Sequence, residues 1–237
     1  MSRVRRTTPA AVLALTCLLV PVVAGCSGDP ADPSSGTTGG DGPAGATPQA
    51  LAAAVLAHTD DDPVAVAPVF GDDRLRRDDL AVELAFPRAE GDNAHVRVVL
   101  SRGLPYARGD EDPCDGPWRC LDASRDGVDG TLLYEAGYPE EDPGVVVAWS
   151  VRADDQVVWA YAYGPFVVPD DDGGPGAETE ALGELLAAVV TDPGVGPTTS
   201  AAYVEAGRDV CEGGAWLRWY GDGNGSPQPE DYVDWCG

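Results

Sequence analysis

Residues 145–163, VVVAWSVRADDQVVWAYAY, decide the fold. Two apolar runs rich in Val, Trp and Tyr flank the polar residues ADDQ at 153–156. Val, Trp and Tyr favour β-strands, and two such runs around a short polar connection are typical of an antiparallel hairpin. We therefore place this hairpin in a sheet and work outward from it.

The length of the turn decides which side chains of the hairpin share a face. A two-residue turn at Asp154 and Asp155 predicts an apolar, helix-covered face with Val147, Trp149, Val151, Val158, Ala160 and Ala162. The opposite face then carries Val146, Ala148, Ser150, Arg152, Val157, Trp159, Tyr161 and Tyr163. Trp159, Tyr161 and Tyr163 form a candidate binding surface, and ordinary cross-strand packing is the alternative. Changing the turn length by one residue would exchange the faces.

Strands are also predicted at 80–86, 95–100 and 131–136, and helices at 47–58 and 178–194. The first helix begins with Thr47 as N-cap and Pro48, and the second ends at Pro193 and Gly194. Together these elements predict an α+β domain. It comprises an antiparallel meander sheet of about five strands, an N-terminal helix, a C-terminal helix and a disulfide-stapled C-terminal tail.

The N-terminus has the features of an export signal. Three arginines precede an apolar run at 9–25 that is short for a bilayer span and contains Pro21. Residues 23–26, VAGC, resemble the lipobox of bacterial lipoprotein precursors. The resemblance implies cleavage between Gly25 and Cys26, a diacylglyceryl group on the Cys26 thiol, and anchoring at the outer face of the cell membrane. An ordinary secretory signal with a chance cysteine is the alternative.

The predicted organisation has four parts. Residues 1–25 are the signal peptide, and 26–46, rich in Gly, Pro, Ser and Asp, are the acylated cysteine and a flexible tether. Residues 47–208 are the α+β domain. Residues 209–237 are an aromatic tail that is closed by a disulfide and packed on the domain.

Four cysteines remain after the signal peptide and the anchor: Cys114, Cys120, Cys211 and Cys236. An even number in an exported chain predicts disulfides with three possible connectivities, and proximity favours Cys114 with Cys120 and Cys211 with Cys236. No cysteine pair has the two-residue gap of a zinc site, so we expect these cysteines to bind no metal; a calcium site in the acidic loops is the alternative. Within the second loop, Trp216, Trp219 and Tyr220 are a further candidate binding surface, with packing on the sheet edge as the alternative.

The charge is strongly negative. The chain has 40 acidic residues against 15 basic ones, all of them Arg. Because binding to phosphate backbones needs positive charge, nucleic acid is disfavoured as a partner. We find no nucleophile elbow, no metalloprotease helix and no phosphate-binding glycine loop, so no catalytic residue and no cofactor is predicted.

Residues 94–200 resemble, in their pattern of strands, cysteines and helix, uncharacterised exported proteins of high-GC actinobacteria; the resemblance implies no activity. The sequence favours a non-enzymatic lipoprotein that binds or senses something in the cell envelope. Its expected partners are the bilayer, through Cys26, and an envelope protein or glycan. The alternatives are an enzyme that acts on envelope polymers with paired carboxylates, and a structural accessory of a membrane complex.

Overall fold

The computed structural model describes residues 44–70, 75–76, 78–103, 114, 119–138, 142–165, 167, 175–218 and 233–236. All of them lie in one compact unit, Gly40–Gly237. Its elements are β1 (Ala44–Gly45), α1 (Pro48–Leu56), β2 (Ala65–Pro68), β3 (Leu80–Phe86), β4 (Ala94–Arg102), β5 (Arg119–Asp122), β6 (Thr131–Tyr138), β7 (Asp142–Val151), β8 (Gln156–Tyr163), α2 (Ala177–Thr191), β9 (Thr198–Thr199) and α3 (Ala201–Glu212). The predicted α+β class is confirmed.

The main sheet has seven strands instead of the predicted five, in the order β2-β3-β4-β8-β7-β6-β5. All neighbouring strands are antiparallel. After β4 the chain crosses to β5 at the far edge of the sheet and returns through β6 and β7 to β8, which pairs with β4. The sheet therefore consists of two meanders, β2–β4 and β5–β8, where one was predicted. The additional strands β2 and β5 are four-residue edge strands. Such strands are too short for a periodic signal.

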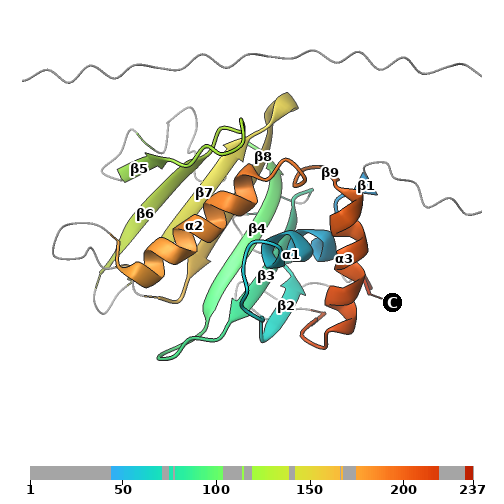
Figure 1. Cartoon of the computed structure of the whole chain (residues 1–237), viewed down its shortest axis with the longest axis horizontal. Helices are drawn as coiled ribbons and strands as arrows, with labels where there is room; N and C mark the ends of the chain where they lie inside the picture. The colour runs from blue at the N-terminus through green and yellow to red at the C-terminus, as the bar shows by residue number, and fades with distance from the viewer. Residues whose placement is uncertain are drawn as a thin grey trace, which may run out of the picture. The chain divides into compact units, whose positions relative to one another are not determined.

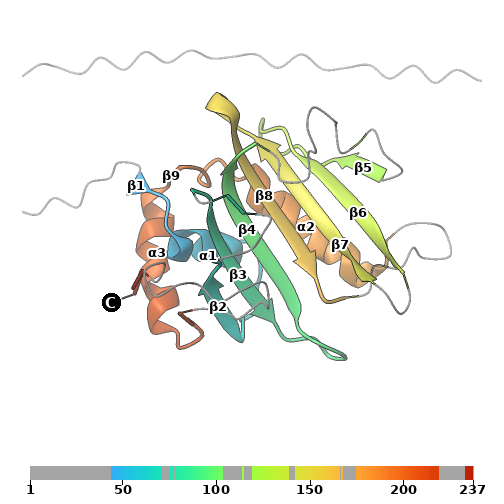
Figure 2. The same cartoon turned by 180° about the vertical axis from the view of Figure 1, so that it is seen from behind.

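Two helices cover one face of this sheet. In Figure 1, α1 and α2 lie in front of the strands, and in Figure 2 the strands lie in front of the helices. The helix-covered core contains alternate residues of the central strands, among them Val82, Val98 and Ala160. The other alternate set, including Val99, Trp149 and Trp159, forms a second apolar cluster on the opposite face, which we call the helix-free face.

The predicted faces of the hairpin are wrong for β7. Trp149 pairs with Trp159 and Val151 with Val157, so the connection is the three-residue turn Ala153–Asp155. Asp155 has a φ of +59°, the left-handed position that such a turn requires. The extra residue moves three β7 side chains to the helix-free face: Val147, Trp149 and Val151. It moves four side chains to the helix side: Val146, Ala148 and Ser150 of β7, and Arg152 directly after it. The Arg152 guanidinium donates to the Val190 and Asp192 carbonyls at the end of α2.

The first helix forms as predicted, and its neighbour α3 was missed. The Thr47 hydroxyl accepts from the Ala50 amide at 3.2 Å, and Pro48 occupies the first turn. α3 contains few apolar residues and buries only Gly207, but its half-buried residues Tyr203, Ala206 and Val210 recur at helical spacing, an amphipathic pattern that was not recognised. A Cβ on Gly207 would lie 3.0 Å from the Ala50 nitrogen, which shows how closely the two helices approach.

Two predicted boundaries need correction. Ala44–Gly45 pairs with Thr198–Thr199, so the domain begins inside the predicted tether at 26–46. The predicted border between residues 208 and 209 falls within the continuous helix α3, because Cys211 belongs to this helix and not to a separate tail. The remaining tether, Gly25 and Cys26 lie outside the described residues.

Replacing Gly164 by Ala is expected to destabilise the domain by about 1–3 kcal/mol. Gly164 follows β8 with a φ of +111°, and a Cβ there would lie 2.3 Å from the backbone oxygen of Asn93. Gly176→Ala is the matched control, since a Cβ at Gly176 meets nothing within 4 Å. Urea unfolding of both variants measures the difference, and equal stabilities would contradict the close approach.

Candidate functional site

Polar side chains gather on the helix-free face where β3, β4 and β8 lie side by side. The strand register places Glu83 opposite Arg97, and Arg97 opposite Tyr161. One row away, His95 lies opposite Tyr163. We call these five residues the Glu83 cluster. Antiparallel pairing thus brings together a carboxylate, a guanidinium, an imidazole and two phenols from three strands.

The Glu83 carboxylate is the hub of this cluster. Its side chain is fully buried, and Oε2 accepts from Arg97 Nε at 2.7 Å. Oε1 accepts from the Tyr163 hydroxyl at 2.7 Å and lies 2.8 Å from His95 Nδ1. Both carboxylate oxygens therefore have partners inside the fold, as a buried charge requires.

The aromatic rings of the cluster form a stack that continues along β8 to Trp159. The ring centroids of His95 and Tyr163 lie 4.7 Å apart, those of Tyr161 and Tyr163 5.9 Å apart, and those of Trp159 and Tyr161 5.2 Å apart. Arg97 Cζ lies 5.2 Å from the Tyr161 ring centroid, in a cation–π arrangement. Of the predicted surface, Trp159 and Tyr161 are only 1% and 3% exposed, and Tyr163 is half-buried. Their rings mainly pack within the domain.

The cluster is built to hold a charge. Burial raises the pKa of Glu83. The His95 hydrogen bond, the Arg97 charge and the Tyr163 hydroxyl together lower it by more, so the net pKa lies below the ordinary 4.5. Burial and the Glu83 carboxylate raise the pKa of Tyr163. At neutral pH the carboxylate is ionised and both of its oxygens are engaged. Such a group stabilises the strands better than it transfers protons.

A second polar cluster joins the ends of three helices. Asp192 follows α2; its Oδ2 accepts from the Tyr203 hydroxyl and lies 2.8 Å from His58 Nε2, and its Oδ1 accepts from the Gly194 amide. Burial raises the pKa of Asp192, and these hydrogen bonds lower it to a net value below the ordinary one. This carboxylate therefore ties the end of α1 and the start of α3 to α2.

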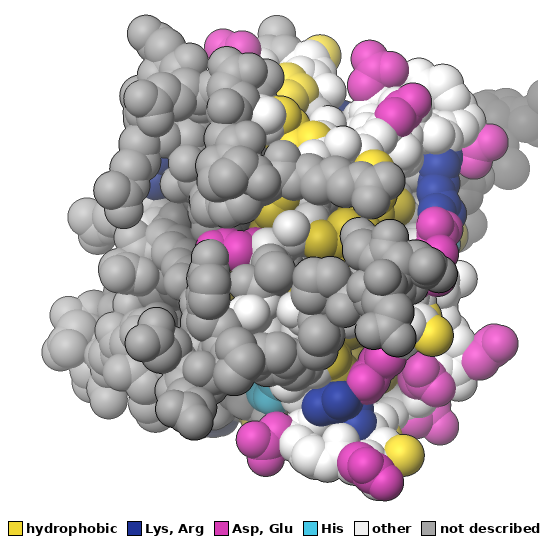
Figure 3. All heavy atoms as spheres, turned by 90° about the vertical axis from the view of Figure 1, so that its left-hand side faces the viewer, with side chains coloured by type: hydrophobic (Ala, Val, Ile, Leu, Met, Phe, Trp, Pro, Cys, Tyr) yellow, Lys and Arg dark blue, Asp and Glu magenta, His cyan; other side chains and the backbone are white. Residues whose placement is uncertain are grey.

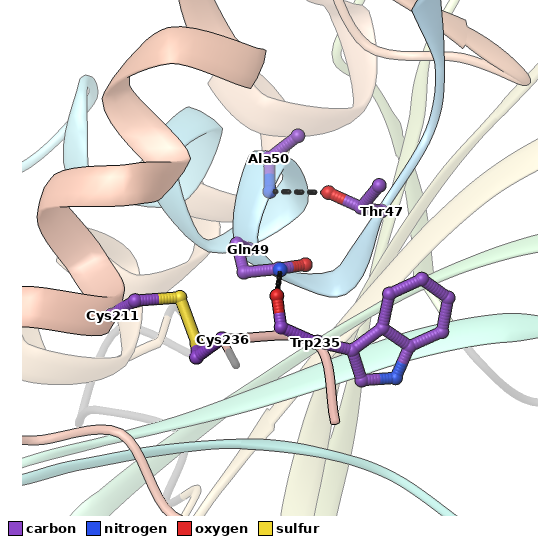
Figure 4. Close-up of a disulfide and its surroundings, with 6 residues drawn as sticks. All are labelled: Thr47, Gln49, Ala50, Cys211, Trp235 and Cys236. Carbon is purple, nitrogen blue, oxygen red and sulfur yellow. Dashed lines mark hydrogen bonds between the residues drawn. A yellow bond between two sulfur atoms is a disulfide. The ribbon is translucent and has the colours of Figure 1, made fainter. Parts of the chain in front are cut away.

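The structure contains both disulfides that proximity favoured. Cys114 is bonded to Cys120 of β5, and Cys211 of α3 to Cys236. Figure 4 shows the second bond next to the start of α1, where the Gln49 amide donates to the Trp235 carbonyl. The described end of the chain is thus fixed to both α3 and α1.

The predicted aromatic surface of the tail is only partly described. Trp216 forms an isolated parallel bridge with Val66 of β2, and its half-buried side chain packs against the helix-covered core. The Ala215 carbonyl and the Leu217 amide hydrogen-bond to the backbone of Val66. Trp219 and Tyr220 lie outside the described residues. Residues 215–217 therefore extend the sheet at its β2 edge.

Two concave surfaces are lined by described residues. The larger, of about 800 Å³, lies between α1, α3 and β2, and we call it the α1–α3 groove. Most of its lining is apolar, and its charged members are Asp62 and Asp209. The smaller, of about 490 Å³, lies beside the Cys114–Cys120 disulfide and includes Trp149. The sequence did not predict the larger groove because its outer wall, α3, was missed. The available signals were the Ser200 N-cap of that helix and its amphipathic spacing.

Neither a metal centre nor a membrane-spanning helix is found in the described part of the chain. No group of three or more His, Cys, Asp or Glu side chains there is arranged to hold a metal ion. No described helix combines the length and apolar character needed to cross a bilayer. No protein-family model, curated protein or solved structure matches this chain.

Proposed function

We propose that the protein is an extracytoplasmic lipoprotein, held by acylated Cys26 at the outer face of the cell membrane, whose acidic domain binds a partner. The observation that carries the proposal is the sequence VAGC at 23–26, between an arginine-led apolar run and a polar spacer. Two acyl chains on one cysteine satisfy the requirement that stable membrane anchoring takes more than a single chain.

The disulfides support an exported location. Both pairs lie in the compact unit that follows the spacer, and one of them fixes a helix to the end of the chain. Disulfides form and persist in oxidising compartments and are rare in the cytosol. The lipobox-like sequence and the disulfides therefore both favour export of the chain out of the cytosol.

A binding role is supported by what the domain exposes. The Glu83 carboxylate is engaged and buried, whereas the α1–α3 groove is open and mainly apolar. The net charge is −25, and in Figure 3 Asp and Glu side chains are spread over the described part of one face with few Arg among them. These features suit a partner that offers apolar and basic groups.

Replacing Cys26 by Ala is expected to abolish incorporation of a fatty-acid probe and to release the protein from the membrane fraction. Cys17→Ala is the matched control, because Cys17 lies in the apolar run that cleavage would remove. The measurement is metabolic labelling of bacterial cells that express each full-length variant. Equal labelling of the Cys26→Ala variant and the unaltered chain would overturn the anchor.

A further inference from the structure

The α1–α3 groove has apolar walls with little cover among the described residues. α3 buries only Gly207, and its half-buried Tyr203 and Val210 line the groove together with Ala206. The opposite side is formed by Leu56 and the edge strand residue Val66, with further lining from Ala53, Ala57, Pro63, Ala202, Gly213 and Ala215. An open apolar surface of this kind marks an interaction site more often than an isolated exposed side chain does.

Exposed apolar side chains continue from this surface along the sheet edge. Val64 is 55% exposed and follows Pro63 of the groove lining; Leu217 is 42% exposed and donates its amide to the Val66 carbonyl. Of the four large apolar side chains that the described residues expose, these two adjoin the groove. These two side chains add exposed apolar surface next to the groove, whereas Val151 lines the smaller concave surface.

The charges around the groove are negative. Asp62 lies on the α1 side and Asp209 on α3, and the described lining contains no basic residue. Asp60 and Asp61 precede Asp62, and Arg208 on α3 is ion-paired with Glu205. A cation in or beside the groove would thus meet two carboxylates, whereas an anion would be repelled.

We propose that the α1–α3 groove binds an amphipathic helical segment of a partner protein, with apolar side chains in the groove and Lys or Arg beside Asp62 and Asp209. Helix-in-groove binding uses an apolar stripe for affinity and flanking charges for orientation. This inference rests on the proposed binding role and names its site and the chemistry of its partner.

The test uses the full chain in nanodiscs of zwitterionic lipid, with empty nanodiscs as blank. The probe is a fluorescent 18-residue helical peptide of Leu and Lys, and the same pattern with Glu in place of Lys is the comparison peptide. Fluorescence anisotropy is expected to show binding of the Leu/Lys peptide above the blank and none of the Leu/Glu peptide. Equal binding of both peptides would contradict the charge selection.

Two sets of variants locate the binding. Asp62→Asn with Asp209→Asn is expected to weaken binding of the Leu/Lys peptide about 3–10-fold, in line with two exposed charge contacts. The control pair, Asp78→Asn with Asp126→Asn, removes the same charge from exposed positions outside the groove lining and is expected to change binding less than twofold. If both pairs of substitutions weakened peptide binding equally, the overall charge and not the groove would explain the effect, and the proposal would be overturned.

A steric variant separates the groove from its charges. Ala206→Trp fills the groove from α3 and is expected to weaken peptide binding at least tenfold while urea unfolding remains a single cooperative transition. If that variant misfolds, Ala202→Leu tests the same wall with a smaller side chain. Unchanged binding in the folded variant would overturn the site. The Cys26 labelling result is independent of this outcome, so loss of the groove would leave the anchor standing.

Discussion

Glu83→Gln is expected to lower the free energy of unfolding by about 3–5 kcal/mol, because it leaves the Arg97 charge buried without its carboxylate. Arg97 is only 3% exposed, so solvent offers little compensation. Glu90→Gln is the matched control at an exposed position, and we expect it to change stability by less than about 0.5 kcal/mol. Urea unfolding at pH 7 measures both, and equal effects would show that the cluster contributes little.

The same variant makes a prediction about pH. The folded-state pKa of Glu83 lies below its ordinary value of 4.5, so its ionised form stabilises the fold above about pH 4.5. That contribution is lost as the pH falls through the lowered pKa. The stability difference between the unaltered chain and Glu83→Gln should therefore shrink on acidification, and a difference that grows would contradict the sign of the shift.

A second variant of the cluster separates pairing from packing. Replacing both Glu83 and Arg97 by Leu removes the two charges together and fills the space with apolar atoms. Losing both partners of a buried pair typically costs less than losing one. The double variant is expected to be more stable than Glu83→Gln. A lower stability of the double variant would mean that the loss of packing, and not an unpaired Arg97 charge, destabilises the domain.

Removing the Cys211–Cys236 disulfide by Ser at both positions is expected to cost about 3.5 kcal/mol on the loop-entropy model. The bond closes a sequence separation of 25 residues and keeps the Trp235 carbonyl at Gln49 of α1. The Cys114–Cys120 bond closes a separation of 6, so its double Ser variant serves as the comparison with an expected cost of about 2 kcal/mol. Urea unfolding under non-reducing conditions ranks the two, and the reverse order would contradict this assignment.

Local signals in the sequence identified much of the fold. Thr47 and Pro48 marked the start of α1, and alternation identified β3, β4, β7 and β8. The register of the long hairpin was not determined, because a left-handed Asp155 lengthens the turn by one residue and turns a whole strand over. The edge strands β2 and β5 are too short for a periodic signal. α3, in contrast, carries an amphipathic pattern with Tyr203, Ala206 and Val210 on one face, which was not recognised.

The candidate sites show the same limit. Glu83 and Arg97 alternate with the apolar residues of their strands and so fall on the face that the pattern predicts to be exposed; their burial could not be predicted. Their meeting required the β3–β4 register, which depends on the connection between those strands. The α1–α3 groove depends on helix packing at Gly207 and on the parallel bridge of Trp216 with Val66, both long-range contacts that local patterns do not encode.

The lipoprotein proposal is tested most directly at the Cys26 sulfur. The protein is isolated from the membranes of a bacterial host, and its N-terminal peptide is analysed by mass spectrometry. We expect a peptide that begins at Cys26 and carries the mass of a diacylglyceryl group on its sulfur. A mature chain that begins elsewhere, or that contains an unmodified Cys26, would contradict the proposed anchor.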